Sequence, residues 1–184
     1  MTEPNRKRIP KFFNYFGGKS RWGRARYPAP KHKKIIEPFC GGAGYSLNYH
    51  WHDIELRDRD ESICGIWDYL VHVSESEILA LPIPEPYQLL CEVDAPVEAQ
   101  HLMGFWYGFV PAVKRKRSLK RKNYGVAGRE SKSLWGPHIR ARIAKHLQYI
   151  RHWKVQQGGY QDIPGNEEAT WFIDPPYIGL PGHY

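Results

Sequence analysis

The feature that most constrains the fold is a short apolar run that ends in a glycine-rich turn. Residues 35–39 (IIEPF) begin with two β-branched side chains, and residues 40–44 (CGGAG) follow at once. β-Branched residues favour strands, and glycine allows tight turns and close approach of a ligand to the backbone. We therefore expect a buried strand, a tight turn and then a short helix over Tyr45–Trp51.

Two further runs are typical of strands. Residues 54–57 (IELR) lead into residues 58–60 (DRD), and residues 171–173 (WFI) lead into residues 174–177 (DPPY). Each of these predicted strands therefore ends at an acidic residue.

Helical spacing of apolar residues separates the predicted strands. It predicts amphipathic helices from Glu61 onward and over His138–Trp153, and a buried helix over Val97–Gly108. Residues 1–34 are basic and rich in Gly and Pro, and we expect them to form a loop or an arm. Strands that alternate with helices indicate an α/β sheet.

The spacing between the glycine turn and the next acid favours a ligand site. Asp58 lies 17 residues after Gly41, at the end of the second predicted strand. In doubly wound folds, an acid about 20 residues after the glycine turn contacts a ribose hydroxyl. Two simpler interpretations stay open: the turn only joins a strand to a helix, and Asp58 and Asp60 only cap loops.

The tetrapeptide at residues 174–177 is the most specific local signal. Its two prolines fix the backbone and donate no hydrogen bonds, so they form a rigid corner with available carbonyl groups. A rigid group of acceptors beside a tyrosine ring suits a planar base that carries an amino group. The alternative is a proline-rich turn without a function.

These motifs and their order resemble those of a known family. Residues 174–177 (DPPY), 37–44 (EPFCGGAG) and 15–19 (YFGGK) look like the signature motifs of Dam-type adenine-specific DNA methyltransferases. The resemblance implies an α/β, Rossmann-like sheet that binds S-adenosylmethionine, with a mostly helical, basic target-recognition insertion. It implies DNA as the substrate and adenine as the target.

The resemblance also implies roles for individual residues. The cofactor-binding residues would be Tyr15, Gly17, Gly18, Lys19, Glu37, Pro38, Phe39, Gly41, Gly44, Asp58 and Asp174. The catalytic residues would be Asp174, Pro175, Pro176 and Tyr177. Among these, Asp58 would hold the ribose, and Tyr177 would stack on the target base.

The chemistry of the reaction explains these residue types. The exocyclic amine of adenine is a poor nucleophile because its lone pair is delocalised into the ring. Asp174 and the carbonyl of Pro175 would accept both amine hydrogens and align the lone pair with the methyl group. The adenine must be extruded from the duplex, and Tyr177 would supply a stacking surface. The reaction needs no metal, and the three cysteines form no CxxC pair.

The net charge of +8 is concentrated in the second half of the chain. Residues 95–184 contain 14 basic and 6 acidic residues, whereas residues 1–94 contain 13 of each. Seven of the basic residues lie between the cofactor motifs and the tetrapeptide: Lys114, Arg115, Lys116, Arg117, Lys120, Arg121 and Lys122. We expect them to contact DNA phosphates, although a solvated loop is the alternative.

The motif positions suggest a division of the chain. We expect residues 1–94 to form the cofactor half of the core, residues 95–165 the basic target-recognition region, and residues 166–184 the return to the core. Members of the family continue well beyond the tetrapeptide, whereas this chain ends seven residues later. We therefore expect a truncated product, or a fragment of a longer methyltransferase, whose sheet is incomplete at the C-terminus.

Two functions stay open at this point. The first is an adenine methyltransferase in the cytoplasm of a bacterium or of a phage-infected host, with no obligatory protein partner. The second is a catalytically inactive remnant that binds nucleic acid. No apolar run approaches the roughly 20 residues that span a membrane, so we expect no membrane association.

Overall fold

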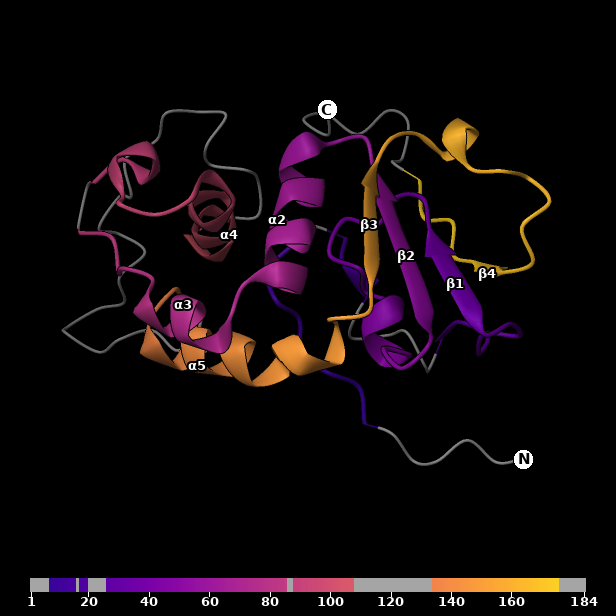
Figure 1. The fold of residues 1–184 in the computed structure, drawn as a ribbon, viewed down its shortest axis with the longest axis horizontal. Coiled ribbons are helices and arrows are strands. Elements are labelled where there is room, and N and C mark those ends of the chain that lie inside the picture. Colours follow the sequence, from indigo (N-terminus) through magenta and orange to yellow (C-terminus); the bar gives the residue numbers. More distant parts are fainter. Residues whose placement is uncertain (1–6, 16, 20–25, 86–87, 108–133, 176–184) are drawn as a thin grey trace.

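The computed structural model describes residues 7–15, 17–19, 26–85, 88–107 and 134–175. Four strands form one parallel sheet with the order β3-β2-β1-β4 (Figure 1). They are β1 (Lys34–Glu37), β2 (Asp53–Asp58), β3 (Lys154–Gln157) and β4 (Thr170–Trp171). The chain moves from β1 outward through β2 to β3, and β4 then returns on the other side of β1. The strand order therefore reverses between β1 and β4, and all carboxyl ends lie at one edge.

The two faces of the sheet differ in polarity. Ile35 pairs with Ile54, and both side chains are fully buried on the face that α2 (Glu61–His72) covers. On the opposite face, Lys34 Nζ lies 2.7 Å from Glu55 Oε2, and Arg57 Nε lies 2.8 Å from Glu55 Oε1. Apolar side chains are therefore buried on the α2 face, whereas the charged side chains on the other face form ion pairs with one another.

Three more α-helices lie beyond α2 on the side away from the sheet (Figure 1). They are α3 (Glu75–Ala80), α4 (Val97–Tyr107) and α5 (Pro137–His146). Short 3-10 helices add η2 (Ser46–Asn48), η3 (Leu90–Glu92), η6 (Leu147–Tyr149) and η7 (Tyr160–Asp162). Helix α4 packs on α2, and α5 packs on α3. In the part of the chain that is described, no helix is long and apolar enough to cross a membrane.

Helices α2 and α3 begin where side chains accept hydrogen bonds from backbone N–H groups. Asp60 is the N-cap of α2, and its carboxylate accepts a hydrogen bond from Ser62 N at 2.9 Å. Ser74 and Glu77 form a reciprocal capping box at the start of α3. Caps of this kind typically contribute about 1 kcal/mol each. Asp60 lies in the turn that follows β2, two residues after Asp58.

The α/β fold and most predicted elements are confirmed. The predicted strands over residues 35–39, 54–57 and 171–173 correspond to β1, β2 and β4, and the helices beginning at Glu61 and Val97 are present. Helix α4 is buried as predicted, and its residues Phe105, Trp106 and Tyr107 belong to the core.

Other details differ from the expectation. The predicted helix over Tyr45–Trp51 is reduced to η2, and the one over His138–Trp153 ends at His146, where η6 tightens the last turn. Strand β3 was not predicted, because its sequence KVQQ is mostly exposed and polar. Residues 7–15 form a loop as predicted, but this loop packs into the core, where Phe12 and Phe13 are each 2% exposed.

Candidate active site

Three acidic side chains lie at the carboxyl edge of the sheet. Glu37 is the last residue of β1, Asp58 is the last residue of β2, and Asp174 follows β4. Backbone hydrogen bonds extend the pairing to this edge, from Phe172 N to Ile36 O and from Cys40 N to Arg57 O, both at 2.9 Å. Open α/β sheets bind ligands outside the carboxyl ends, where the strand order reverses. The acids lie at that position.

The glycine turn binds directly to Asp58. Gly41 has a φ of +43° and donates its N–H to Asp58 Oδ2 at 3.0 Å. The second oxygen, Oδ1, accepts from Asp60 N at 3.0 Å. Trp67 of α2 holds the other side of the turn, because its Nε1 donates to Gly41 O at 2.8 Å. The acid and the turn, predicted from their spacing, are therefore in direct contact.

Tyr15 lies over the same turn. A Cβ atom added to Gly41 would lie only 2.5 Å from Cε1 of Tyr15, and one added to Gly42 would lie 3.0 Å from its Cβ. Glycine is therefore needed at position 41 for two reasons: the left-handed backbone and the closeness of the ring. The first and second sequence motifs, residues 15–19 and 37–44, are separated by 17 residues of chain and are in contact here.

Lys19 joins the first motif to the tetrapeptide. Its Nζ lies 2.8 Å from Asp174 Oδ2 and donates to Gly17 O at 2.9 Å. The side chains of Lys19 and Asp174 are 19% and 27% exposed, so this ion pair is accessible from solvent. Gly17, with a φ of +73°, and Gly18, whose N–H donates to Tyr15 O at 3.2 Å, form the turn that directs the lysine toward Asp174.

Glu37 is the buried acid of the group. It is 2% exposed, and its Oε1 accepts from Ser46 N at 2.6 Å. Burial, and to a lesser extent the nearby carboxylate of Asp174, raise the pKa of Glu37 to about 7, although hydrogen bonds from Ser46 oppose the shift. Burial also raises the pKa of Asp58, against the backbone hydrogen bonds from Asp60 and Gly41 that favour its charged form. The acidic groups at this edge therefore favour binding of a cation over binding of a further anion.

The other residues predicted at the cofactor lie beside this group. Pro38 and Gly44 belong to the turn region after β1, and Gly44 O accepts from Asn48 Nδ2 at 2.7 Å. The ring of Phe39 packs on Tyr160, with centroids 5.8 Å apart. Asp60 is the N-cap of α2, and both oxygens of Asp58 accept from backbone N–H groups, so the contacts of both acids agree with the capping interpretation.

Part of the predicted site falls outside the described residues. Pro175 is exposed at the end of the described segment. Outside it lie Pro176, Tyr177, Lys114, Arg115, Lys116, Arg117, Lys120, Arg121 and Lys122.

Four neighbours of the site had no role predicted from the sequence. Ser46 and Trp67 hold Glu37 and the turn, as described above. Cys64 Sγ donates to Asp58 O at 3.4 Å, and Cys40 Sγ lies 3.9 Å from Asp58 Oδ2. Burial raises the pKa of Cys64 to about 11, so this thiol is neutral. Only the tertiary contacts reveal these roles, because no motif contains Trp67 or Cys64.

Metal binding finds no support in the described ranges, where no group of three or more His, Cys, Asp or Glu side chains is arranged to hold an ion. His50 packs against Trp51 and Tyr149, with ring centroids 5.1 and 5.0 Å away.

The arrangement can bind a ligand that carries both positive and negative groups. It offers the carboxylates of Asp58 and Asp174, the ammonium group of Lys19 beside Asp174, and the buried carboxyl group of Glu37. We compared the sequence with protein-family models and with curated proteins, and neither comparison found a match.

Proposed function

We propose that the chain transfers a methyl group from S-adenosylmethionine to the exocyclic amine of a flipped adenine in DNA, as a Dam-type methyltransferase with a Rossmann-like sheet. One observation carries this proposal. Tyr15 lies over Gly41, Gly41 donates to Asp58, and Lys19 pairs with Asp174, so distant parts of the chain come together at the carboxyl edge of the sheet. A proline-rich turn and a plain strand-to-helix turn would not require that meeting.

The residues present fit this cofactor. Asp58 is partly exposed, and a carboxylate has about four acceptor positions, so it can accept from ribose hydroxyls beside its two backbone donors. Lys19 suits the carboxylate of the methionine part, and the acids suit its ammonium and sulfonium groups. When bound, the cofactor supplies an electrophilic methyl group.

Asp174 is the residue that would act on the amine. Its Oδ2 is held by Lys19, which fixes the direction of the carboxylate. With acceptor positions on both oxygens, the carboxylate can bond an amine hydrogen while it keeps the ion pair. The carbonyl of Pro175 would accept the second hydrogen, and the two bonds would turn the nitrogen lone pair toward the methyl group. The proton lost from the nitrogen would pass to Asp174 and then to solvent.

Transfer of a labelled methyl group to unmethylated DNA tests this function. The wild-type chain should label adenine, and Asp174→Ala should lower the rate at least about 100-fold because the acceptor is lost. Asp94→Asn, which changes an exposed acid between η3 and α4, is the control and should keep the rate.

Cofactor binding separates the two functions left open by the sequence. Binding of S-adenosylmethionine measured by calorimetry should accompany methyl transfer. A chain that binds DNA but neither binds the cofactor nor labels adenine would instead be a nucleic-acid-binding remnant, and the proposal would be wrong.

A further inference from the structure

Trp67 connects the helical core to the candidate active site, although it belongs to none of the sequence motifs. Its side chain is 0% exposed, and its indole Nε1 donates to Gly41 O at 2.8 Å. A buried indole N–H normally has an acceptor, but many backbone carbonyl groups could serve. Here the acceptor is the glycine whose N–H binds Asp58.

The two hydrogen bonds of Gly41 fix the backbone on both sides of its Cα atom. The N–H before the Cα donates to Asp58 Oδ2 at 3.0 Å, and the carbonyl after it accepts from Trp67. Gly41 has a φ of +43°. Because glycine has more accessible conformations than any other residue, a turn at glycine keeps one conformation only where contacts hold it. Trp67 therefore helps to keep the Gly41 N–H directed at Asp58.

A chain of aromatic contacts leads from Trp67 back to the same turn. The ring centroids of Trp67 and Phe13 lie 5.3 Å apart, and those of Phe13 and Phe105 lie 5.2 Å apart. Phe105 in turn lies 5.9 Å from Tyr15, whose ring covers Gly41. Aromatic pairs at such distances attract one another beyond their burial. The turn is thus held from one side by the indole hydrogen bond and from the other by Tyr15.

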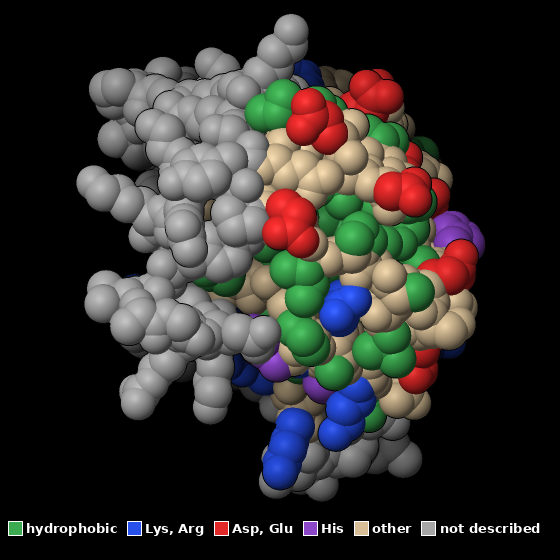
Figure 2. Space-filling view, turned by 90° about the vertical axis from the view of Figure 1, so that its left-hand side faces the viewer, with side chains coloured by type: hydrophobic (Ala, Val, Ile, Leu, Met, Phe, Trp, Pro, Cys, Tyr) green, Lys and Arg blue, Asp and Glu red, His purple; other side chains and the backbone are tan. Residues whose placement is uncertain are grey.

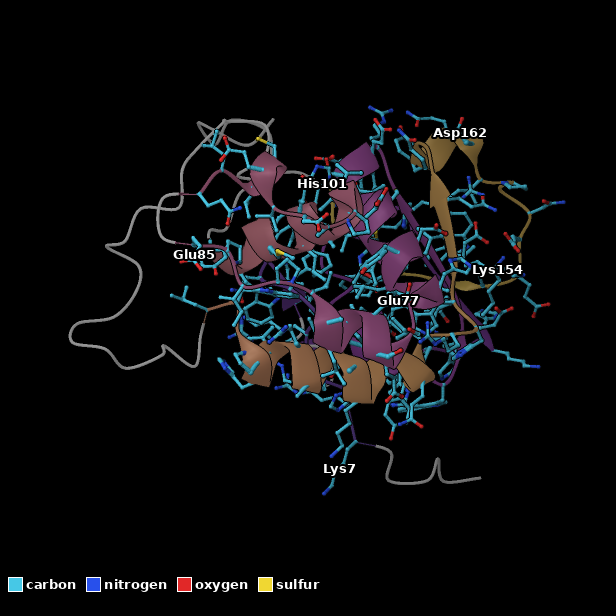
Figure 3. The ribbon with its side chains drawn as sticks, turned by 60° about the vertical axis from the view of Figure 1, so that its left-hand side comes forward. Lys7, Glu77, Glu85, His101, Lys154 and Asp162 are labelled. Atoms are coloured by element: carbon cyan, nitrogen blue, oxygen red, sulfur yellow. The ribbon has the colours of Figure 1, made fainter. Side chains whose placement is uncertain are left out.

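The two sides of α2 have different surroundings. The side chain of Asp68, the residue after Trp67, is 63% exposed, and on the helical face acidic side chains lie mainly above and along the right-hand rim (Figure 2). Below this surface, α2 packs on α4 and on β3, and Figure 3 shows it between His101, on α4, and Lys154, at the start of β3. Trp67 lies on the inner side, where it contacts the turn and is shielded from solvent.

We propose that Trp67 is a positioning residue for cofactor binding, because it holds the Gly41 turn in the conformation that directs Asp58 toward the ribose of S-adenosylmethionine. The ribose rests on the proposed function, whereas the fixing of the turn rests on the contacts of Trp67 alone. Trp67 is fully buried, so it acts through Gly41 and not by touching the cofactor. Binding groups depend on such supporting residues, since a small displacement weakens their contacts.

The test compares Trp67→Phe with Trp153→Phe in the full chain. Trp153 is 3% exposed, its Nε1 donates to His50 O at 3.2 Å, and its ring centroid lies 5.6 Å from that of Trp67. Each variant therefore loses one indole hydrogen bond and the same ring volume from the same core, but only Trp67 binds the turn. Asp68→Asn, on the solvent side of α2, is a second control.

Hydrogen exchange of the Gly41 amide, measured by NMR without cofactor, reports on the turn directly. We expect exchange to be about tenfold faster in Trp67→Phe than in Trp153→Phe and Asp68→Asn, because opening of the turn separates the Gly41 N–H from Asp58. Equal exchange rates in Trp67→Phe and Trp153→Phe would overturn the proposal.

Calorimetric titration with S-adenosylmethionine measures the consequence for binding. The Kd should rise about tenfold in Trp67→Phe and less than about twofold in Trp153→Phe, while both variants lower the Tm by similar amounts. A Kd that rises equally in both variants would indicate a general effect of core stability. It would overturn the positioning role.

The wild-type chain supplies a test that does not depend on the folding of any variant. On addition of S-adenosylmethionine, the indole N–H resonance of Trp67 should shift, and that of Trp153 should not. An unshifted Trp67 resonance at saturating cofactor would overturn the proposal. A wild type that binds no cofactor, together with faster Gly41 exchange in Trp67→Phe, would contradict only the proposed function.

Discussion

At the scale of a single residue, Glu37 makes the stability of the folded chain depend on pH. Burial raises its pKa from 4.5 to about 7, so the folded chain releases the proton at higher pH than the unfolded chain does. An acid with a raised pKa stabilises the fold at low pH, and this contribution is lost as the pH rises toward about 7. The full loss corresponds to about 3 kcal/mol.

Glu37→Gln should remove this dependence. Glutamine keeps a carbonyl oxygen for Ser46 N and has no charge. Compared with the wild type, the variant should gain about 3 kcal/mol of unfolding free energy between pH 4.5 and pH 8, measured by urea denaturation. Glu75→Gln on the exposed surface of α3 should show no such gain. Equal pH profiles for Glu37→Gln and the wild type would contradict the buried-acid interpretation.

Lys19 provides the second prediction at the scale of a residue. Lys19→Met removes the cation 2.8 Å from Asp174 and frees the carboxylate to turn. We expect kcat/KM for methyl transfer to fall about 10- to 100-fold, because a partly buried charge loses its partner and its orientation. Lys33→Met, at an exposed lysine just before β1, should retain the activity. Equal rates for Lys19→Met and Lys33→Met would show that Lys19 does not contribute to methyl transfer.

At the scale of elements, the turn after β1 is the structure that assembles the site. Gly41→Ala would place a methyl group 2.5 Å from the ring of Tyr15, on a backbone with a φ of +43°. We expect a loss of about 2–3 kcal/mol of stability and weaker cofactor binding, because the ring must move away from the turn.

Gly165→Ala is the matched control for that substitution. A Cβ at this position meets no atom within 4 Å, so both its stability and its cofactor affinity should be those of the wild type. Calorimetric titration with S-adenosylmethionine and thermal unfolding measure the two effects. Cofactor affinity that is unchanged in Gly41→Ala would show that the turn does not bind the cofactor.

The same elements show what the sequence could predict. Strands β1 and β2 and the glycine turn were predictable because apolar runs and glycine reflect local physics. Their closeness to Lys19 and Asp174 was expected only from the family resemblance, since the contact spans more than 150 residues of chain. Strand β3 was missed because an exposed edge strand lacks apolar periodicity. Asp60 was ambiguous, because an acid after a strand serves equally as a ligand or as a helix cap.

At the scale of the whole molecule, one hydrophobic cluster joins the parts that the motif positions had separated. It includes Phe12 of the N-terminal segment, Ile35 of β1, Trp67 of α2, Trp106 of α4 and Ile143 of α5. Strand β3, which lies within the predicted target-recognition region, pairs with β2 in the sheet. Those described parts of residues 95–165 therefore share the core of the sheet, and the contact of residues 114–122 with DNA stays a prediction.

A shared core predicts cooperative unfolding. Phe12→Ala should lower the unfolding free energy by about 3–5 kcal/mol, because Phe12 is 2% exposed and its ring packs edge-on against Trp67 with centroids 5.8 Å apart. Leu79→Ala, at a side chain that is 48% exposed, should cost less than about 1 kcal/mol. Far-ultraviolet circular dichroism and tryptophan fluorescence should report coincident urea transitions for the wild type and both variants, since the core contains tryptophans from α2 and α4 together. Two separated transitions, with only one of them shifted by Phe12→Ala, would show instead that the helical part folds independently of the sheet.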